Sequence, residues 1–409
     1  MADSYSVACG STDITPREPI PLAGYATLRK ATFDRIADPL EANVIVLRKG
    51  AGTVVFVALD LMYVGAYLRD AIDKAGGSRV AAGVTFSTAV HTHSGPPTED
   101  SLPILGAVTP SYRDFVAKRV GDLMARLLDG PFVPVSLTYC AGAAAHSVNR
   151  RKKVFGLSRT FPFVGPHVRI RPNLSGPRDE TVHVLRIRNT AGQDVAACWS
   201  YACHPVGFPL LNDLSAEYPG FVRQMMRAQF GDMPVVFWQG FSGNTAPLQT
   251  PDVVTRSTAP AGYSLRASTM AEWREWARGL GECAINTVRG GGRPVSGTLS
   301  HSVRTLAVRE LGLLSQKQLQ LHEIRLGPDL LICGLSAEVA VEYGEILRKL
   351  HAPAQVIPVG CVGDVFGYLP VDAMVREGGY EAQGFLRRFG LKGQFLPNIT
   401  EIVTQRLLS

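Results

Sequence analysis

Two histidines, His91 and His93, stand one residue apart in the stretch Ala-Val-His-Thr-His-Ser-Gly-Pro-Pro over 89–97. Residues 83–90 predict a buried strand, and Ser-Gly-Pro-Pro predicts an abrupt turn directly after the histidines. We expect the two imidazoles to point to opposite sides, so that one binds a metal or substrate while the other handles protons. The alternative is a strand end that carries two ordinary surface histidines.

Two further residues extend this motif to a possible metal site. His204, in Cys-His-Pro-Val, and Glu338, in Ser-Ala-Glu, make with His91 a set of two histidines and one carboxylate. Such a set suits Zn²⁺ with one position left open for water, which is the basis of metal-assisted amide or ester hydrolysis. The alternatives are buried structural histidines and, for Glu338, a favourable acid in the first turn of a helix predicted over 338–350.

The elements that must position these residues are strands, and six predicted strands each deliver a polar group at or beyond their ends. The strands are predicted over 53–60, 83–90, 194–202, 234–239, 329–335 and 356–360, and the polar residues are Asp60, His91, His204, Asn244, Glu338 and Tyr368. Helices are predicted over 65–75, 111–128 and 268–288, with another opening at 215–220 and a polar stretch over 250–264. This pattern predicts an α/β fold of mixed sheets flanked by helices, with a site at one sheet edge.

The composition bounds the class of protein. The chain has 409 residues, 46% of them hydrophobic and 19% charged, which excludes a disordered or fibrous protein. We predict one domain over 1–409, with its core over about 7–386 and a C-terminal tail over 387–409. Seven cysteines without a CxxC pair, no signal-peptide pattern and no apolar run long enough for a transmembrane segment predict a cytoplasmic protein with reduced thiols.

The formal charge of +7 is concentrated in one segment. A long loop predicted over 149–180 and the strand after it carry Arg150, Arg151, Lys152, Lys153, Arg159, Arg169, Arg171, Arg178, Arg186 and Arg188. Such a segment faces an anionic ligand, a membrane surface or nucleic acid, or is simply a solvated basic loop. Nucleic acid is excluded as a predicted partner because no helix-turn-helix, zinc-finger or RNA-binding signature accompanies the charge.

Several of these motifs together resemble those of the neutral (non-lysosomal) ceramidase family. They are the His-Thr-His-Ser-Gly-Pro string of 91–96, Asn149-Arg150, His204-Pro205, the turn of 243–247, Glu338 and Gly367-Tyr368-Leu-Pro. The Asp-Ile-Thr-Pro of 13–16 and Pro-Leu-Ala-Gly-Tyr of 21–25 resemble shorter bacterial relatives, which fits a chain without the family's C-terminal immunoglobulin-like domain and secretion signal. The resemblance spans about 7–386 and implies a zinc-dependent amidase with a neutral-ceramidase-like catalytic domain of mixed α/β fold.

The resemblance also implies roles for single residues. His91, His204, Glu338 and Tyr368 are expected to bind the zinc. His93 and Arg150, with Tyr368, are expected to act in catalysis by contacting the substrate or the developing oxyanion. Arg150, Arg151 and Asn244 are expected to contact the substrate.

One motif departs from the family. The Gly-Asp-x-Ser-Pro turn is Gly-Asn-Thr-Ala-Pro over 243–247, so both the acid and the hydroxyl are missing. We therefore expect a small N-acyl amide substrate with a polar or anionic group that meets Arg150 and its basic neighbours. The alternatives are a ceramidase that hydrolyses ceramide to sphingosine and a fatty acid, and a zinc- or lipid-binding relative without activity.

Overall fold

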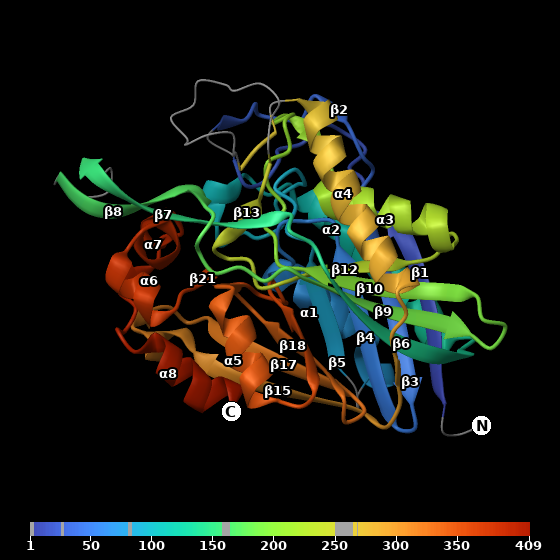
Figure 1. The fold of residues 1–409 in the computed structure, drawn as a ribbon. Coiled ribbons are helices and arrows are strands. Elements are labelled where there is room, and N and C mark those ends of the chain that lie inside the picture. The colour runs from blue at the N-terminus through green and yellow to red at the C-terminus, as the bar shows by residue number, and fades with distance from the viewer. Residues whose placement is uncertain (1–3, 26–27, 81–83, 158–163, 250–264, 268) are drawn as a thin grey trace.

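The computed structural model describes residues 4–25, 28–80, 84–157, 164–249, 265–267 and 269–409. Two β-sheets pack on each other, and helices cover the outer face of each sheet (Figure 1). The predicted α/β class with mixed sheets flanked by helices is confirmed. Arg159 and the polar stretch over 250–264 lie outside the described residues.

The larger sheet has the strand order β12-β10-β9-β6-β1-β3-β4-β5, with β14 paired to β6. Its strands are β1 Tyr5–Asp13, β3 Glu41–Lys49, β4 Gly52–Leu59, β5 Val84–Ala89, β6 Val133–Ala143, β9 Thr181–Asn189, β10 Asp194–Tyr201, β12 Val235–Gln239 and β14 Arg293–Val295. β3 and β4 read as near-continuous apolar runs because both of their faces are buried. The sheet is curled, so that Phe56 of β4 packs against Trp238 of the distant strand β12, with ring centroids 5.2 Å apart.

The smaller sheet has the order β15-β17-β18-β20 and packs on the inner face of the first. Its strands are β15 Leu299–Ala307, β17 Gln318–Leu326, β18 Leu330–Leu335 and β20 Gln355–Val359. Ile324, Ile332 and Ile357 belong to the same apolar cluster as Phe56 and Trp238. Both sheets therefore share one buried core, whose burial is the main stabilising term.

Helices cover the outer faces, each through an apolar stripe. On the larger sheet lie α1 Gly65–Gly76, α2 Pro110–Asp129, α3 Glu217–Phe230 and α4 Met270–Arg289. On the smaller sheet lie α5 Glu342–Leu350, α6 Asp372–Glu377, α7 Phe385–Arg388 and α8 Ile399–Val403. The predicted C-terminal tail contributes Ile399, Leu407 and Leu408 to this last layer, and all three are fully buried.

Short elements complete the fold. Three strand pairs are β2 Arg35–Ile36 with β11 Asp213–Leu214, β16 Leu313–Leu314 with β22 Lys392–Gly393, and β19 Glu338–Val339 with β21 Tyr368–Leu369. Short helical turns are η2 Gly77–Val80, η3 Pro103–Leu105, η4 Val308–Leu311, the π-helical η5 Tyr380–Gly384 and η6 Thr404–Leu408. All seven cysteines are free thiols, as predicted. None of the described helices combines the length and the apolar character needed to cross a bilayer.

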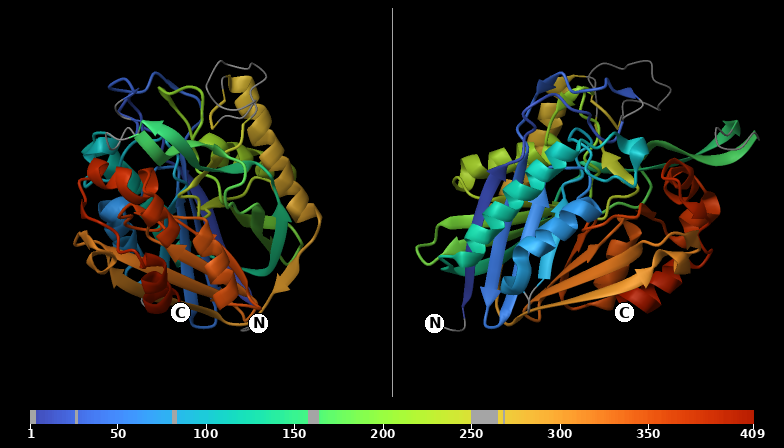
Figure 2. Two further views of the ribbon diagram at one scale, coloured as in Figure 1. Left: turned by 60° about the vertical axis from the view of Figure 1, so that its left-hand side comes forward. Right: turned by 180° about the vertical axis from the view of Figure 1, so that it is seen from behind.

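The prediction of a long loop is wrong for the segment 149–180. It is a β-hairpin of β7 Ser147–Leu157 and β8 Val164–Asn173, which joins β13 Thr245–Pro247 in a three-stranded sheet and extends away from the body (Figures 1 and 2). Charged residues occupy both faces of these strands, so the alternation of apolar and polar residues that marks a half-buried strand is missing from the sequence.

Three pairs of parallel strands position the site. They are β4 with β5, β10 with β12, and β18 with β20. Backbone hydrogen bonds join the loops that follow them: Gly360 donates to Gln239 at 2.7 Å, and Gly243 donates to Val339 at 2.7 Å. The carboxyl ends of all three pairs therefore meet in one place, where α/β proteins commonly bind ligands.

Candidate metal centre and active site

Three of the predicted zinc ligands converge at this meeting point. His91 follows β5, His204 follows β10 and Glu338 begins β19. The two Nε2 atoms of the histidines lie 3.1 Å apart, and Glu338 Oε2 lies 3.4 Å from His91 Nε2 and 3.5 Å from His204 Nε2. All three side chains are almost completely buried.

A backbone carbonyl at the far side of each ring fixes the orientation of the imidazole. His91 Nδ1 lies 2.9 Å from the carbonyl oxygen of Met62, and His204 Nδ1 lies 3.2 Å from that of Ser242. Because a carbonyl only accepts, each Nδ1 carries a proton, and each Nε2 is the ring atom that faces the cluster. Although burial lowers it, Cys361 and Glu338 hold the pKa of His91 well above its usual value. Burial and Arg150 hold the pKa of His204 well below its usual value, so this ring is a neutral ligand.

These donor atoms fit a bound cation. Two imidazole Nε2 atoms and a carboxylate oxygen face one another at close range, and within the described part of the chain Glu338 Oε2 accepts no hydrogen bond. Buried acceptors in such an arrangement repel one another unless a positive charge lies between them. Two imidazoles and a carboxylate are ligands that Zn²⁺ prefers.

Glu338 and Tyr368 are brought together by a strand pair and not by a helix. The predicted helix over 338–350 is wrong at its start, because Glu338 lies in β19 opposite Tyr368 of β21, and α5 begins only at Glu342. Burial, together with the neighbouring Glu338, raises the pKa of Tyr368 well above its usual value. The loop of Gly243 packs so closely on Glu338 that a Cβ at Gly243 would lie 2.6 Å from the Glu338 carbonyl oxygen.

His93 lies beside His91 on the same side of the loop, so the expectation that the two rings point apart is wrong. The strand ends at Ala89, His91 has a φ of 68°, and in an extended segment residues i and i+2 face the same way in any case. The ring centroids of His93 lie 5.1 Å from His91 and 5.2 Å from His204. One ring nitrogen from each of these three histidines lies within 4.8 Å of the others.

The ring of His93 is available for chemistry. Neither of its nitrogens has a hydrogen-bond partner among the residues that the structure describes, although the side chain is buried. Burial and the neighbouring His91 and Arg150 hold its pKa well below the usual value, so the imidazole is neutral. Gly24 packs against it, because a Cβ there would lie 2.6 Å from His93 Nδ1.

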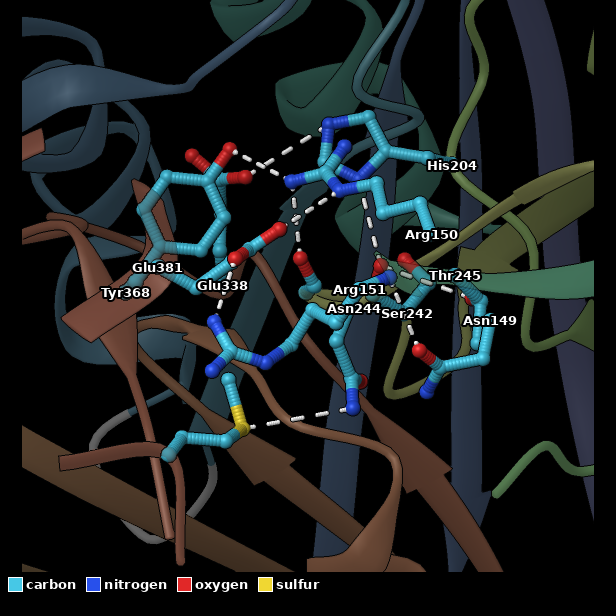
Figure 3. A network of polar contacts seen from close by, with 12 residues as sticks. Asn149, Arg150, Arg151, His204, Ser242, Asn244, Thr245, Glu338, Tyr368 and Glu381 are labelled. Atoms are coloured by element: carbon cyan, nitrogen blue, oxygen red, sulfur yellow. Dashed lines mark hydrogen bonds and ion pairs between the residues drawn. The ribbon is translucent and has the colours of Figure 1, made fainter. Parts of the chain in front are cut away.

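A buried ionic network borders the cluster (Figure 3). Arg150 donates from Nη2 to the Tyr368 hydroxyl at 3.2 Å and to the Gly243 carbonyl at 2.8 Å, and from Nε to Glu381 at 2.9 Å. Arg151 donates to the other oxygen of Glu381 at 2.8 Å. One fully buried carboxylate of the π-helical turn therefore holds two guanidinium groups, and π-helical turns are often found at functional sites.

Two other predicted substrate contacts are engaged with the protein. The Nη2 atom of Arg151 donates to the Gly378 carbonyl at 2.8 Å and lies 3.4 Å from the carboxylate of Glu377. The Asn244 side chain accepts from the backbone of Val341 at 2.8 Å and donates to Glu342 at 2.9 Å. Both side chains thus tie the loops of the site together.

Asp60 does not join the cluster, although it follows β4 as predicted. Its carboxylate forms a two-pronged ion pair with Arg223 of α3, at 2.9 and 2.7 Å, and accepts from the backbone of Glu41. Both partners of this ion pair are buried. The role of Asp60 is therefore to bind α3 to the end of the sheet.

Sequence reasoning missed two residues next to the cluster. The Tyr63 hydroxyl donates a hydrogen bond to Glu338 Oε1, which fixes the orientation of the carboxylate. Glu217, at the start of α3 with a φ of 49°, accepts from the His93 backbone at 3.1 Å and from the Ser94 hydroxyl at 3.0 Å. Burial raises the pKa of Glu217 to about 8. The only signal in the sequence was an acid in the Ser-Ala-Glu-Tyr-Pro opening of a helix, which is ordinary in itself.

A cavity of about 420 Å³ opens beside the ionic network. It lies between the β7–β8 hairpin and helices α5 and α6, and its walls include Asn149, Arg151, Lys152, Lys153, Glu342 and Glu377. None of the four predicted zinc ligands lines it. Among the predicted substrate contacts, Arg151 faces this cavity.

The comparisons with known proteins concern the fold. No protein-family model matches the sequence, and no curated protein matches it. The crystal structure of neutral ceramidase from Pseudomonas aeruginosa aligns with a TM-score of 0.76 at 16% identity, over 98% of this chain and 73% of that chain. A structure of ceramidase complexed with C2 aligns with a TM-score of 0.75 at 14% identity, over 98% of this chain and 74% of that chain. The chain therefore has the neutral ceramidase fold, as its motifs predicted.

Proposed function

We propose that this chain is a zinc-dependent hydrolase of N-acyl amide bonds. The observation that carries the proposal is the convergence of His91 Nε2, His204 Nε2 and Glu338 Oε2 within 3.5 Å of one another in a buried site. The fold shared with ceramidases, which by name act on the amide ceramide, supports the amide as the bond that is cleaved. The free thiols suit a reducing compartment, and we propose a cytoplasmic location.

The residues that would hold the metal are His91, His204 and Glu338, with the Tyr368 hydroxyl as a fourth ligand. When bound, Zn²⁺ supplies Lewis acidity that activates water and polarises a carbonyl. The carbonyl groups behind both imidazoles orient the rings, and Tyr63 orients the carboxylate. Outer contacts of this kind typically strengthen metal binding.

Arg150 stabilises negative charge in this proposal. Its guanidinium reaches the Tyr368 hydroxyl at 3.2 Å, and Glu381 fixes its orientation from the other side. A fixed cation at this position stabilises the oxyanion that develops when an amide carbonyl is attacked. It also draws a polar or anionic group of the substrate to the site, which favours such N-acyl amines over neutral ceramide.

His93 is the residue that we assign to proton handling. Its ring is neutral, and both of its nitrogens are free of hydrogen bonds within the described residues, so one can donate to the substrate while the other accepts. Arg151 and Asn244 support the substrate site indirectly, because their side chains hold the loops that form it.

Turnover of N-acyl amino acids and of short-chain ceramide by the zinc-loaded protein tests the proposal. We expect the N-acyl amino acids to be the better substrates, and Arg150→Ala to raise KM or lower kcat on them, while the matched surface variant Arg348→Ala changes neither. Unchanged kinetics of Arg150→Ala would show that Arg150 neither binds the substrate nor stabilises the oxyanion. Faster turnover of ceramide would favour the ceramidase alternative, which the shared fold supports. No hydrolysis despite a full zinc site would favour the non-catalytic relative, which the missing acid and hydroxyl of 243–247 support.

A further inference from the structure

The β7–β8 hairpin forms an arm that extends beyond the body of the molecule (Figures 1 and 2). We define the arm as residues 151–157 and 164–170, which pair from Arg151 with Ile170 out to Leu157 with Val164. Its base packs on the body, since Val168 lies against Gly379. The arm exposes two large apolar side chains: Ile170, 49% exposed, lies at its base opposite Arg151, and Phe155, 79% exposed, lies further out opposite Pro166. Single exposed apolar residues are common on protein surfaces, so these two side chains support an interaction surface only together with the charge of the arm.

The charge of the arm has one sign. No Asp or Glu occurs between 149 and 178 in the sequence. Lys152 lies opposite Arg169 in the register, so both occupy the same face, and Lys153 projects from the other face with 70% of its side chain exposed. Among the residues that the structure describes, Lys152 forms no ion pair. Lys153 lies 2.8 Å from Glu377, but an exposed pair of this kind contributes little and is screened by salt.

We propose that the arm binds the surface of a bilayer that contains anionic lipids. Basic side chains interleaved with exposed aromatic and aliphatic residues combine the two attractions that hold a protein at such a surface, which are charge and shallow apolar insertion. Nucleic acid would use the same cations but gains nothing from an aliphatic side chain such as Ile170, because its readers stack aromatic rings on bases. The proposal is independent of the chemistry of the metal site.

Co-sedimentation of the purified full chain with lipid vesicles tests the proposal. We expect binding to phosphatidylcholine vesicles that contain phosphatidylglycerol, weakening as salt rises, and little binding to phosphatidylcholine alone. The double variant Lys152→Glu/Lys153→Glu should bind at least about 30-fold more weakly, since each basic residue near the surface contributes about a fivefold factor. Phe155→Ser should also weaken binding, through lost apolar insertion.

The matched control is Lys118→Glu/Lys349→Glu. It changes the net charge equally, and both lysines are 74% exposed on other elements of the body. Thermal unfolding of all variants checks that they fold. The proposal is overturned if wild type ignores the anionic vesicles, if neutral vesicles bind it equally well, or if the control loses as much binding as the arm variant. Retention of DNA or RNA by the arm at salt concentrations that release the vesicles would overturn it as well.

Discussion

Replacing Glu217 with Gln should change how the stability of the protein depends on pH. This carboxyl group accepts from the His93 backbone and the Ser94 hydroxyl through Oε1, and Oε2 has no hydrogen-bond partner in the described part of the chain. Glutamine keeps the shape of the side chain and the accepting oxygen. It replaces Oε2 by an amide nitrogen and removes the ionisation, so the pH dependence of the difference from wild type isolates the effect of charge at this buried position.

The magnitude follows from the raised pKa of Glu217, which burial moves from 4.5 to about 8. Below about pH 4.5 the group is protonated in both the folded and the unfolded chain, so it does not change the free energy of unfolding with pH. Between these values the unfolded chain releases the proton while the folded chain keeps it, so the free energy of unfolding falls by about 1.4 kcal/mol per pH unit. Over the whole interval the loss reaches on the order of 5 kcal/mol and then stays constant.

Urea unfolding of both proteins at about pH 5, 7 and 9 measures this effect. We expect the free energy of unfolding of Glu217→Gln to increase relative to that of wild type as pH rises. All other titrating groups are common to the two proteins, so their contributions cancel in the difference. Glu345→Gln, at an exposed position of α5, is the control, and its free energy of unfolding should depend on pH in the same way as that of wild type. A difference between wild type and Glu217→Gln that stays constant from about pH 5 to 9 would refute the reasoning.

Three further substitutions distinguish residues that act at the proposed metal site from residues that stabilise the protein around it. Tyr63→Phe removes the donor to Glu338 and should weaken zinc affinity by about 10- to 100-fold in chelator competition; unchanged affinity would contradict the assigned role. Glu381→Gln leaves two buried guanidiniums short of a counter-charge and should lower the free energy of unfolding by about 3–5 kcal/mol. It should also lower kcat more than it raises KM, because Arg150 loses its orientation; a stability loss with normal kcat would make Glu381 purely structural. Asp60→Asn should cost a similar 3–5 kcal/mol yet keep the zinc content, and loss of zinc would place Asp60 in the site after all.

The sequence predicted the fold class, which the structure confirms, and it predicted candidate metal ligands that the structure brings together. Buried strands and amphipathic helices follow simple periods, and the polar groups of His91, His204 and Glu338 stand where such strands end. The single-domain organisation over 1–409 stays a prediction, supported by the core that both sheets share. Zinc binding by His91, His204, Glu338 and Tyr368 also stays a prediction, and so do the roles of His93, Arg150, Arg151 and Asn244. The structure places His93, Arg150 and Tyr368 next to the other candidate ligands.

Features that depend on distant packing were beyond the sequence. The β7–β8 hairpin was hidden because its basic residues obscure the alternation of a strand. The left-handed backbone of His91 was also beyond the sequence, because a non-glycine residue adopts it only when its surroundings require it. That His93 faces the same way as His91, in contrast, follows from the strand period alone. Glu217 and Glu381 reach the site from segments more than 120 and 230 residues away from their partners His93 and Arg150, and no local pattern reports such contacts.

The most direct test of the account is the metal content of the purified protein, measured by elemental mass spectrometry beside His91→Ala and His204→Ala. The account predicts about one zinc per chain in wild type, in keeping with a single site of two histidines and a carboxylate, and its loss in both variants. Folding of the variants is checked by circular dichroism. A wild-type protein that contains no zinc, and takes up none when zinc is added, would contradict a zinc site at His91, His204 and Glu338.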